Sequence, residues 1–438
     1  MKKFLYSYFS IRERGSTIPR ELVAGTVTFA AMVYILAVQP GIMKAAGMDP
    51  GAVFTATAIS AGFATLVMAF LGKIPIALAS GLGINAYIAF SVCGPMGFTW
   101  QTALAAVFVE GIVFLIISFC GIREKIVQAI PEELKKAVAL GIGLFIAIIG
   151  LNGAGILSVG GGTPVAINSI TSGAPLVAVI GLLLVIVLYS LKIPGSILIA
   201  ILATTVIGIP FGVTTIPTGF SFISIPPAPY TPLDIISGLK SVPLVDFVVV
   251  FFSLLFIDMF DTVSTLAGVA LQGNLIDKKG NIINCKEALL SDAIGTTFGS
   301  LIGATTVTSY IESSTGVAVG GRTGLASVAT GIFFLLALFL SPVFLLIPSA
   351  ATAPALIFVG FLMLGAVSNL DLRNVEIGLP IFITMLIIPM SYSISEGLAW
   401  GFICYTLVKV VKMKWKEISL ATWILTIVFL IKLIFVRL

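Results

Sequence analysis

The chain has 438 residues, of which 58% are hydrophobic and only 10% are charged, with a formal net charge of +5 and no histidine. Soluble domains carry about 25% charged residues, so this composition excludes an ordinary soluble protein. The lack of histidine excludes a histidine-based proton relay and removes the commonest metal ligand, so any proton chemistry must use carboxylates.

Long apolar runs recur from one end of the chain to the other. A helix needs about 20 apolar residues to cross a bilayer. The runs that approach this length are 22–41, 53–72, 102–120, 137–151, 176–191, 193–209, 244–257, 325–347, 352–367, 377–390, 397–411 and 418–436. They predict an all-α polytopic membrane protein. The first run is too long for a signal peptide, so we expect it to be the first span.

The basic residues indicate how the chain is oriented. They form four clusters: Lys2, Lys3, Arg12, Arg14 and Arg20; Arg123, Lys125, Lys135 and Lys136; Lys278, Lys279 and Lys286; Lys409, Lys412, Lys414 and Lys416. With a cytoplasmic N-terminus, all four clusters fall on the cytoplasmic side, and the outside loops hold only Lys44 and Lys240. This positive-inside bias predicts a multi-pass protein of the cell membrane. The charge is topological and gives no reason to expect a nucleic-acid partner.

The connections divide the chain. The stretch 121–136 is amphipathic and is expected at the cytoplasmic surface. Residues 210–243 are rich in proline and threonine and predict an outside loop. The expected divisions are a cytoplasmic N-terminus (1–20), a first repeat (21–210), an extracytoplasmic loop (211–242), a second repeat (243–411) and a basic and apolar C-terminal segment (412–438). The four cysteines are scattered without CxxC spacing, which favours neither a disulfide framework nor a metal site, and no cofactor is expected.

Each half contains one broken segment, KIPIALASGLGINAYIAFSVCGP (73–95) in the first and SLIGATTVTSYIESSTGVAVGGRTG (300–324) in the second. Both pair a short extended stretch with a short helix-like stretch, and both come third in their half. Such matching segments indicate an inverted-repeat transporter with its binding site between them. Seven segments in each half give 14. The last run, 418–436, is then surplus and either crosses the membrane or lies in the interface.

Four acids lie within predicted spans: Glu110, Asp258, Asp261 and Glu312. An aspartate at the centre of a membrane helix costs about 3 kcal/mol on insertion scales, which makes it a candidate for function. Asp258 and Asp261 are three residues apart and share one helix face. The structural alternative is that these acids hydrogen-bond across helices or cap the broken segments, and for Glu110 this alternative is favoured.

The broken segments supply the remaining candidates. Glu312 stands at the start of a short helix whose free N–H groups would lie beside its carboxylate, which suits a ligand with both donors and acceptors. The Asn85 amide offers both as well. Gly83 allows close approach of the backbone, although a small-residue packing surface is the alternative. Ile311 and Ser313 flank Glu312 and are expected to line the same site.

The sequence resembles the AzgA-like purine permeases, a branch of the nucleobase–ascorbate (NCS2) transporter superfamily. The resemblance rests on several stretches in order: GLGINAY, FTWQTALAAVFVEGIVF, FIDMFDT and TTVTSYIESSTGVAVGGRTG. It covers nearly the whole chain, from ERGSTIPRELVAGTVTF to the basic cluster after residue 408.

The resemblance implies 14 spans in a 7+7 inverted repeat, with spans 1–4 and 8–11 as a core domain and spans 5–7 and 12–14 as a gate. It implies import of hypoxanthine, guanine or adenine, usually driven by protons, by a transporter that is not an enzyme. The family's binding residues fall on Asn85, Gly83, Asp258 and Glu312. Coupling and gating are expected among Glu312, Asp258, Asp261 and Glu110. The family counterpart of Asp261 has a less certain role.

The chemistry agrees with a neutral purine as ligand, because carboxylates make charge-assisted hydrogen bonds to N–H donors. Related anion transporters are the first alternative, but carboxylates beside a bound anion would repel it. Uracil, xanthine and ascorbate remain as other cargoes, and a passive channel remains as another mechanism. An intramembrane aspartyl protease needs its aspartates on two helices, whereas this pair shares one. The expected partners are a purine and the lipid bilayer, and a homodimer is one option for assembly.

Overall fold

The computed structural model describes residues 2–120, 131–160, 163–240, 244–276, 282–367 and 372–435. Within these ranges, seven helical stretches are long and apolar enough to cross a membrane: Ile18–Lys44, Pro50–Gly72, Trp100–Phe119, Glu133–Gly153, Gly173–Ser190, Phe247–Gln272 and Gly324–Leu345. Shorter apolar helices accompany them, including Ser196–Ile207, Ser349–Met363, Val375–Ser391 and Leu420–Ile431. The prediction of a mainly helical, multi-pass membrane protein is therefore confirmed.

The first half begins with a surface helix and a span that is interrupted near its middle. Its elements are α1 (Lys2–Tyr8), α2 (Ile18–Met32), α3 (Ile35–Lys44), α4 (Pro50–Val67), β1 (Leu78–Ser80), α5 (Leu82–Tyr87), α6 (Trp100–Phe119), α8 (Glu132–Gly153), β2 (Leu157–Gly160), β3 (Thr163–Ile167), α9 (Gly173–Ser190) and α10 (Ser196–Ile207). A π-helical turn, Met68–Gly72, extends α4, and another, Ile88–Val92, extends α5.

The second half also contains a broken segment, formed by β4 and α14, between longer helices. Its elements are α11 (Pro232–Ile236), α12 (Leu244–Gln272), α13 (Cys285–Leu301), β4 (Val307–Ser309), α14 (Ser313–Ala318), α15 (Gly324–Ala337), α16 (Ser341–Leu345), α17 (Ser349–Met363), α18 (Val375–Ser391), α19 (Ile394–Val411) and α20 (Leu420–Phe435). Most of the predicted amphipathic stretch 121–136 lies outside the described residues. The last apolar run forms α20, which packs on α19; whether it crosses the membrane stays a prediction.

Strands β1 and β4 join the two broken segments deep inside the protein. They are antiparallel, with Leu78 opposite Ser309, Ala79 opposite Thr308 and Ser80 opposite Val307. All six residues are buried. The run of β-branched residues from Thr305 to Thr308 favours an extended backbone over a helix. Pairing satisfies backbone groups that would otherwise be unpartnered at membrane depth.

The contacts between helices define two groups. In one group, α13 contacts α4 and α6, and α15 contacts α2 and α4. In the other, α8 contacts α17 and α18, and α17 contacts α9. Helices α8 and α17 cross so closely that a Cβ on Gly360 would lie 2.3 Å from the carbonyl oxygen of Gly143. Helix α12 contacts both groups, through α6 on one side and α8 on the other.

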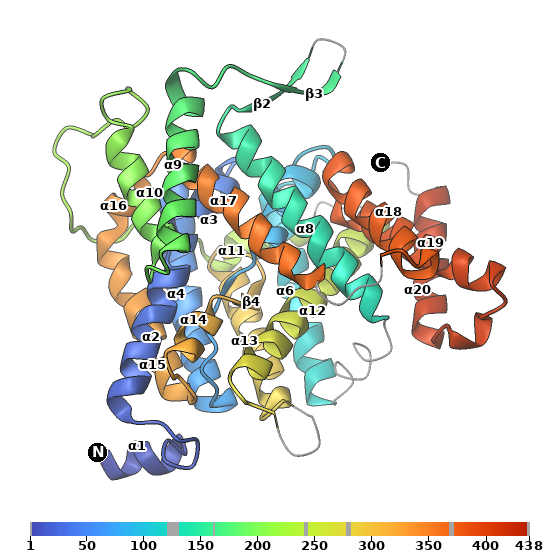
Figure 1. The fold of residues 1–438 in the computed structure, drawn as a ribbon, viewed down its shortest axis with the longest axis horizontal. Helices are drawn as coiled ribbons and strands as arrows, with labels where there is room; N and C mark the ends of the chain where they lie inside the picture. The colour runs from blue at the N-terminus through green and yellow to red at the C-terminus, as the bar shows by residue number, and fades with distance from the viewer. Residues whose placement is uncertain are drawn as a thin grey trace.

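The predicted outside loop has no helix before α11, and it is tied to the first group of helices. Tyr230 stacks on Trp100 with ring centroids 4.5 Å apart, and its hydroxyl accepts a hydrogen bond of 2.7 Å from the backbone N–H of Asp49. The β2–β3 hairpin, by contrast, projects from the body of the protein beyond α8 and α9 (Figure 1).

Candidate substrate site

The antiparallel β1–β4 pair places the start of α5 at one end of the pair and the start of α14 at the other. The backbone N–H of Gly81, which precedes α5, donates to the carbonyl of Thr306 at 3.0 Å. On the other side, the N–H of Tyr310 donates to the carbonyl of Ala77 at 3.0 Å. The Tyr310 hydroxyl donates to the carbonyl of Ser80 at 2.6 Å. The two broken segments therefore form one unit around which the candidate residues are arranged.

Glu312 occupies the N-cap position of α14, as the sequence predicts, and its side chain is buried. Its Oε1 atom accepts a hydrogen bond of 2.6 Å from the hydroxyl of Tyr34, which is itself only 1% exposed. Tyr34 lies at the break between α2 and α3. A short bond of this kind to a carboxylate is strong and fixes the orientation of both groups.

Asp258 and Asp261 both lie on α12, but they have different surroundings. Asp258 is fully buried, and its Oδ1 atom accepts a hydrogen bond of 3.0 Å from the hydroxyl of Thr262. Asp261 is partly exposed, hydrogen-bonds to Thr308 of β4 and interacts electrostatically with Glu312. The two acids share one face of α12, as their spacing predicts, but their side chains contact different neighbours.

Asp292 of α13 belongs to the same cluster. The Thr262 hydroxyl lies 3.0 Å from its Oδ1 atom, and Asp261 interacts electrostatically with it. Asp292 is not among the four acids predicted within spans, yet it is fully buried within α13. The surrounding stretch, CKEALLSDAIG, carries enough charge that it reads as the end of a span rather than its interior.

Asn85 is fully buried on α5, and its side-chain oxygen accepts a short hydrogen bond from the hydroxyl of Thr305. Thr305 also accepts a hydrogen bond of 3.4 Å from the amide of Gln39 on α3. Within the described ranges, the Nδ2 atom of Asn85 and the Oε1 atom of Gln39 have no hydrogen-bonding partner. Buried polar atoms are nearly always hydrogen-bonded, so this donor and this acceptor are available to a ligand.

Glu110 is fully buried on α6, and its Oε2 atom accepts a hydrogen bond of 2.9 Å from the hydroxyl of Thr306, next to β4. It therefore fastens α6 to the second broken segment. This contact agrees with the structural alternative weighed for Glu110, while its expected part in gating stays a prediction.

The three remaining candidates contact different neighbours. A Cβ on Gly83 would lie 2.7 Å from Cγ2 of Ile142 on α8, so Gly83 marks a close approach between α5 and α8. The Ser313 hydroxyl accepts a hydrogen bond of 3.0 Å from the N–H of Ala77 and so binds the protein's own backbone. Ile311 is 42% exposed. Their roles in binding stay predictions.

Sequence reasoning missed the hydroxyl groups of the site, those of Tyr34, Thr262, Thr305 and Thr308. Tyr34 and Thr305 gave no signal, because their positions are set by helix packing across more than 260 residues. Thr262 could have been found, since it lies four residues after Asp258 and so faces it on the same helix.

Comparison with known proteins agrees with this picture. Residues 19–399 match the permease family Xan_ur_permease. The guanine/hypoxanthine permease PbuG of Bacillus subtilis is 40% identical, with 98% of this chain and 100% of that protein aligned. The adenine permease AdeP of Escherichia coli is 37% identical, with 98% and 95% aligned.

Solved structures share the fold. The transmembrane domain of the cyanobacterial bicarbonate transporter BicA is 16% identical, with a TM-score of 0.63 over 87% of this chain and 97% of that one. SLC26A9 is also 16% identical, with a TM-score of 0.67 over 94% and 67%. At this identity the likeness concerns the fold alone.

The family and the fold define a membrane permease, not an enzyme. The chain belongs to the NCS2 permease family, with purine permeases among its relatives, as its motifs predict.

Proposed function

We propose that the protein imports purine nucleobases (hypoxanthine, guanine or adenine) across the plasma membrane by proton symport. The observation that carries the proposal is that both ends of the β1–β4 pair carry buried polar groups: the Glu312 carboxylate at one end, and the Asn85 amide with its unpartnered nitrogen at the other. Purines present ring N–H and exocyclic amino groups to carboxylates, and ring nitrogens and carbonyl oxygens to an amide N–H. The relatives named as guanine/hypoxanthine and adenine permeases support this choice of cargo.

In the proposed architecture, 14 spans form two inverted repeats of seven, and the N-terminus is cytoplasmic. Spans 1–4 and 8–11 form the core and spans 5–7 and 12–14 form the gate. The two groups of helices that pack among themselves support this division. Their contacts at α5 with α8, and at α12 with α8 and α19, then mark the surface along which the core moves during alternating access.

The cluster around Thr262 supports proton coupling. A hydroxyl carries one hydrogen and donates it to only one carboxylate at a time. Its two contacts, to Asp258 and to Asp292, are both hydrogen bonds only when one carboxyl group carries a proton and donates it to Thr262. A proton held in this way lies close to Asp261, which interacts electrostatically with both Asp292 and Glu312.

The test is uptake of labelled hypoxanthine, guanine, adenine, xanthine and uracil into proteoliposomes. Neutral purine uptake should be electrogenic and, in sodium-free buffer, should follow a pH gradient that is acidic outside. Uptake that needs sodium and ignores the pH gradient would contradict proton coupling. Uptake that equilibrates without either gradient would indicate a passive channel. Counterflow measured with and without an ionophore distinguishes a passive channel from a symporter.

The fold alone also allows an anion as cargo, since one structural neighbour is named as a bicarbonate transporter. The charges argue against this alternative, because Asp258, Asp261 and Glu312 would repel an anion at close range. Bicarbonate or sulfate uptake at rates comparable to those of purines would reverse this conclusion.

A further inference from the structure

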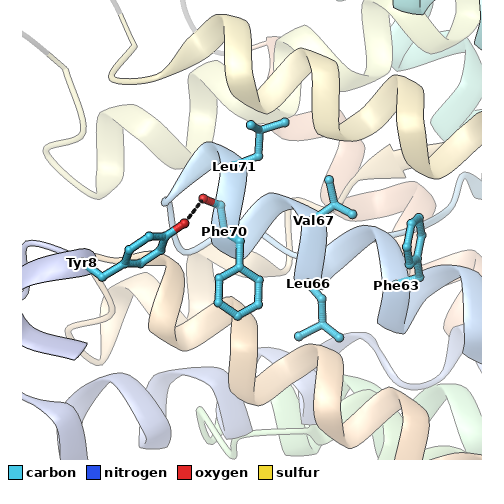
Figure 2. A pocket seen from close by; sticks show the side chains of 6 residues that line it. All are labelled: Tyr8, Phe63, Leu66, Val67, Phe70 and Leu71. Carbon is cyan, nitrogen blue, oxygen red and sulfur yellow. Dashed lines mark hydrogen bonds between the residues drawn. The ribbon is translucent and has the colours of Figure 1, made fainter. Parts of the chain in front are cut away.

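The outer surface of α4 carries an apolar groove with a volume of about 620 Å³ (Figure 2). It is lined by Phe63, Leu66, Val67, Phe70 and Leu71 of α4 and its π-helical extension, and by Tyr8 of α1. These residues lie on the candidate span Pro50–Gly72, apart from Tyr8. An exposed surface on a span faces the acyl chains of lipids rather than water.

Next to the groove, α4 packs closely against α15. A Cβ on Gly62 would lie 2.7 Å from Leu335, and a Cβ on Gly331 would lie 3.0 Å from the carbonyl oxygen of Gly62. Small residues at such a crossing allow two membrane helices to approach closely. Phe63 stacks on Phe298 of α13, with ring centroids 4.2 Å apart, at one end of the groove.

The other end of the groove is closed by α1. The Tyr8 hydroxyl donates a hydrogen bond of 3.0 Å to the carbonyl of Phe70 (Figure 2). The Phe9 ring also packs against the Phe70 ring, with ring centroids 5.9 Å apart. A positively charged side chain, that of Lys73, lies at this end. The Lys73 ammonium lies 4.2 Å above the centroid of the Tyr8 ring. None of the ion pairs among the described residues includes Lys73.

We propose that this groove binds an anionic phospholipid of the inner leaflet, with one acyl chain along α4 and the headgroup phosphate at Lys73. The apolar lining and the cation at one end match the two parts of such a lipid, and the proposed topology, on which this inference rests, places that end at the cytoplasmic side. An anionic surface attracts each nearby basic residue by about 1 kcal/mol, so one well-placed lysine favours an anionic over a neutral headgroup severalfold. A bound lipid would also contact Tyr8 and so hold α1 against the core.

Photo-crosslinking in nanodiscs tests the proposal with the full-length protein. Phosphatidylglycerol or phosphatidylcholine with a diazirine on one acyl chain is incorporated, irradiated and located by mass spectrometry of peptides. We expect the segment from Phe63 to Leu71 to be labelled severalfold more by phosphatidylglycerol. Lys73→Gln should reduce this labelling to the level of phosphatidylcholine. Lys44→Gln, an exposed lysine at the other end of the spans, should not change it.

A second pair of variants tests the acyl-chain part of the site. Val67→Trp should fill the groove and reduce labelling by both lipids, whereas Leu183→Trp, on an exposed face of α9, should leave it unchanged. Equal labelling by the two lipids that Lys73→Gln does not alter would overturn the proposal. So would a lack of label in this segment, or crosslinks to a second protein chain in its place. If Val67→Trp fails to fold, the Lys73 comparison still decides, because Lys73 is partly exposed and Lys73→Gln adds no bulk.

Discussion

Asp258 of α12 and Asp292 of α13 are joined by one hydroxyl group, that of Thr262, which lies 3.0 Å from a carboxylate oxygen of each. Both acids are fully buried, so this hydroxyl is a link between two neighbouring helices as well as between two charges.

Replacing Thr262 tests that link. Thr262→Val keeps the shape of the side chain but removes the hydroxyl, and loss of a buried hydrogen-bonding partner costs about 1–3 kcal/mol. We expect proton-driven purine uptake to fall about tenfold or more, with a lower melting temperature. Thr262→Ser, which restores the hydroxyl, should recover most of the uptake. Equal loss in both variants would mean that the methyl group, not the hydroxyl, is required.

Asp258 and Asp261 should be separable by substitution. Asp258→Asn should weaken purine binding by about 10- to 150-fold, the effect of losing a charge-assisted hydrogen bond of roughly 1.5–3 kcal/mol. Asp261→Asn should reduce transport more than binding, because Asp261 lies between β4 and Glu312. Binding by calorimetry and uptake by filtration distinguish the two. If Asp261→Asn abolishes binding and Asp258→Asn does not, the two roles are exchanged.

Asn85 should determine which purine is preferred. Its unpartnered Nδ2 atom offers a donor that only some purines can use at that position. Asn85→Ala should therefore change the rank order of hypoxanthine, guanine and adenine in competition assays while binding persists. Ser327→Ala is the control and should keep the order, because the buried Ser327 hydroxyl of α15 already donates to the backbone carbonyls of Ile74 and Ile76. An unchanged order in Asn85→Ala would contradict this role.

Tyr34 should affect purine binding by orienting the Glu312 carboxylate. Tyr34→Phe removes a hydrogen bond of 2.6 Å to a buried carboxylate, a loss of roughly 1.5–3 kcal/mol. We expect purine affinity to fall by about tenfold or more while the protein stays folded. The additional effect of Tyr34→Phe should be much smaller in a Glu312→Gln background, as required for coupled residues. Additive effects in the double variant would show that the two side chains act separately.

Gly83 should test the contact between core and gate. Gly83→Ala would place a Cβ 2.7 Å from Ile142 of α8, so we expect slower transport or reduced stability. Ile142→Ala removes the obstructing atom, and the double variant should recover uptake relative to Gly83→Ala alone. Ile149→Ala, another buried position on α8, should not rescue. No rescue by Ile142→Ala would exclude this contact as the cause.

The sequence was sufficient for the helical architecture, because apolar runs and broken segments depend on local composition. It placed Glu312 at the start of α14 and identified 73–95 and 300–324 as the segments that interrupt the helices. It could not predict that Thr305 would contact Asn85, or that Tyr34 would contact Glu312, since these pairs are set by how the two halves pack. Asp292 was missed because a charged flanking sequence made a buried position resemble the end of a span.

The pairing of β1 with β4 has a consequence for how the protein is made. Tyr310 bonds to Ser80 across 230 residues of chain, so β1 has no strand partner while only the first half has been synthesised. An unpaired strand at membrane depth is costly, because its backbone groups find no water. The first half should therefore be short-lived when expressed alone. Coexpression with the second half as a separate polypeptide should protect it from proteolysis, since assembly of the two supplies the missing strand.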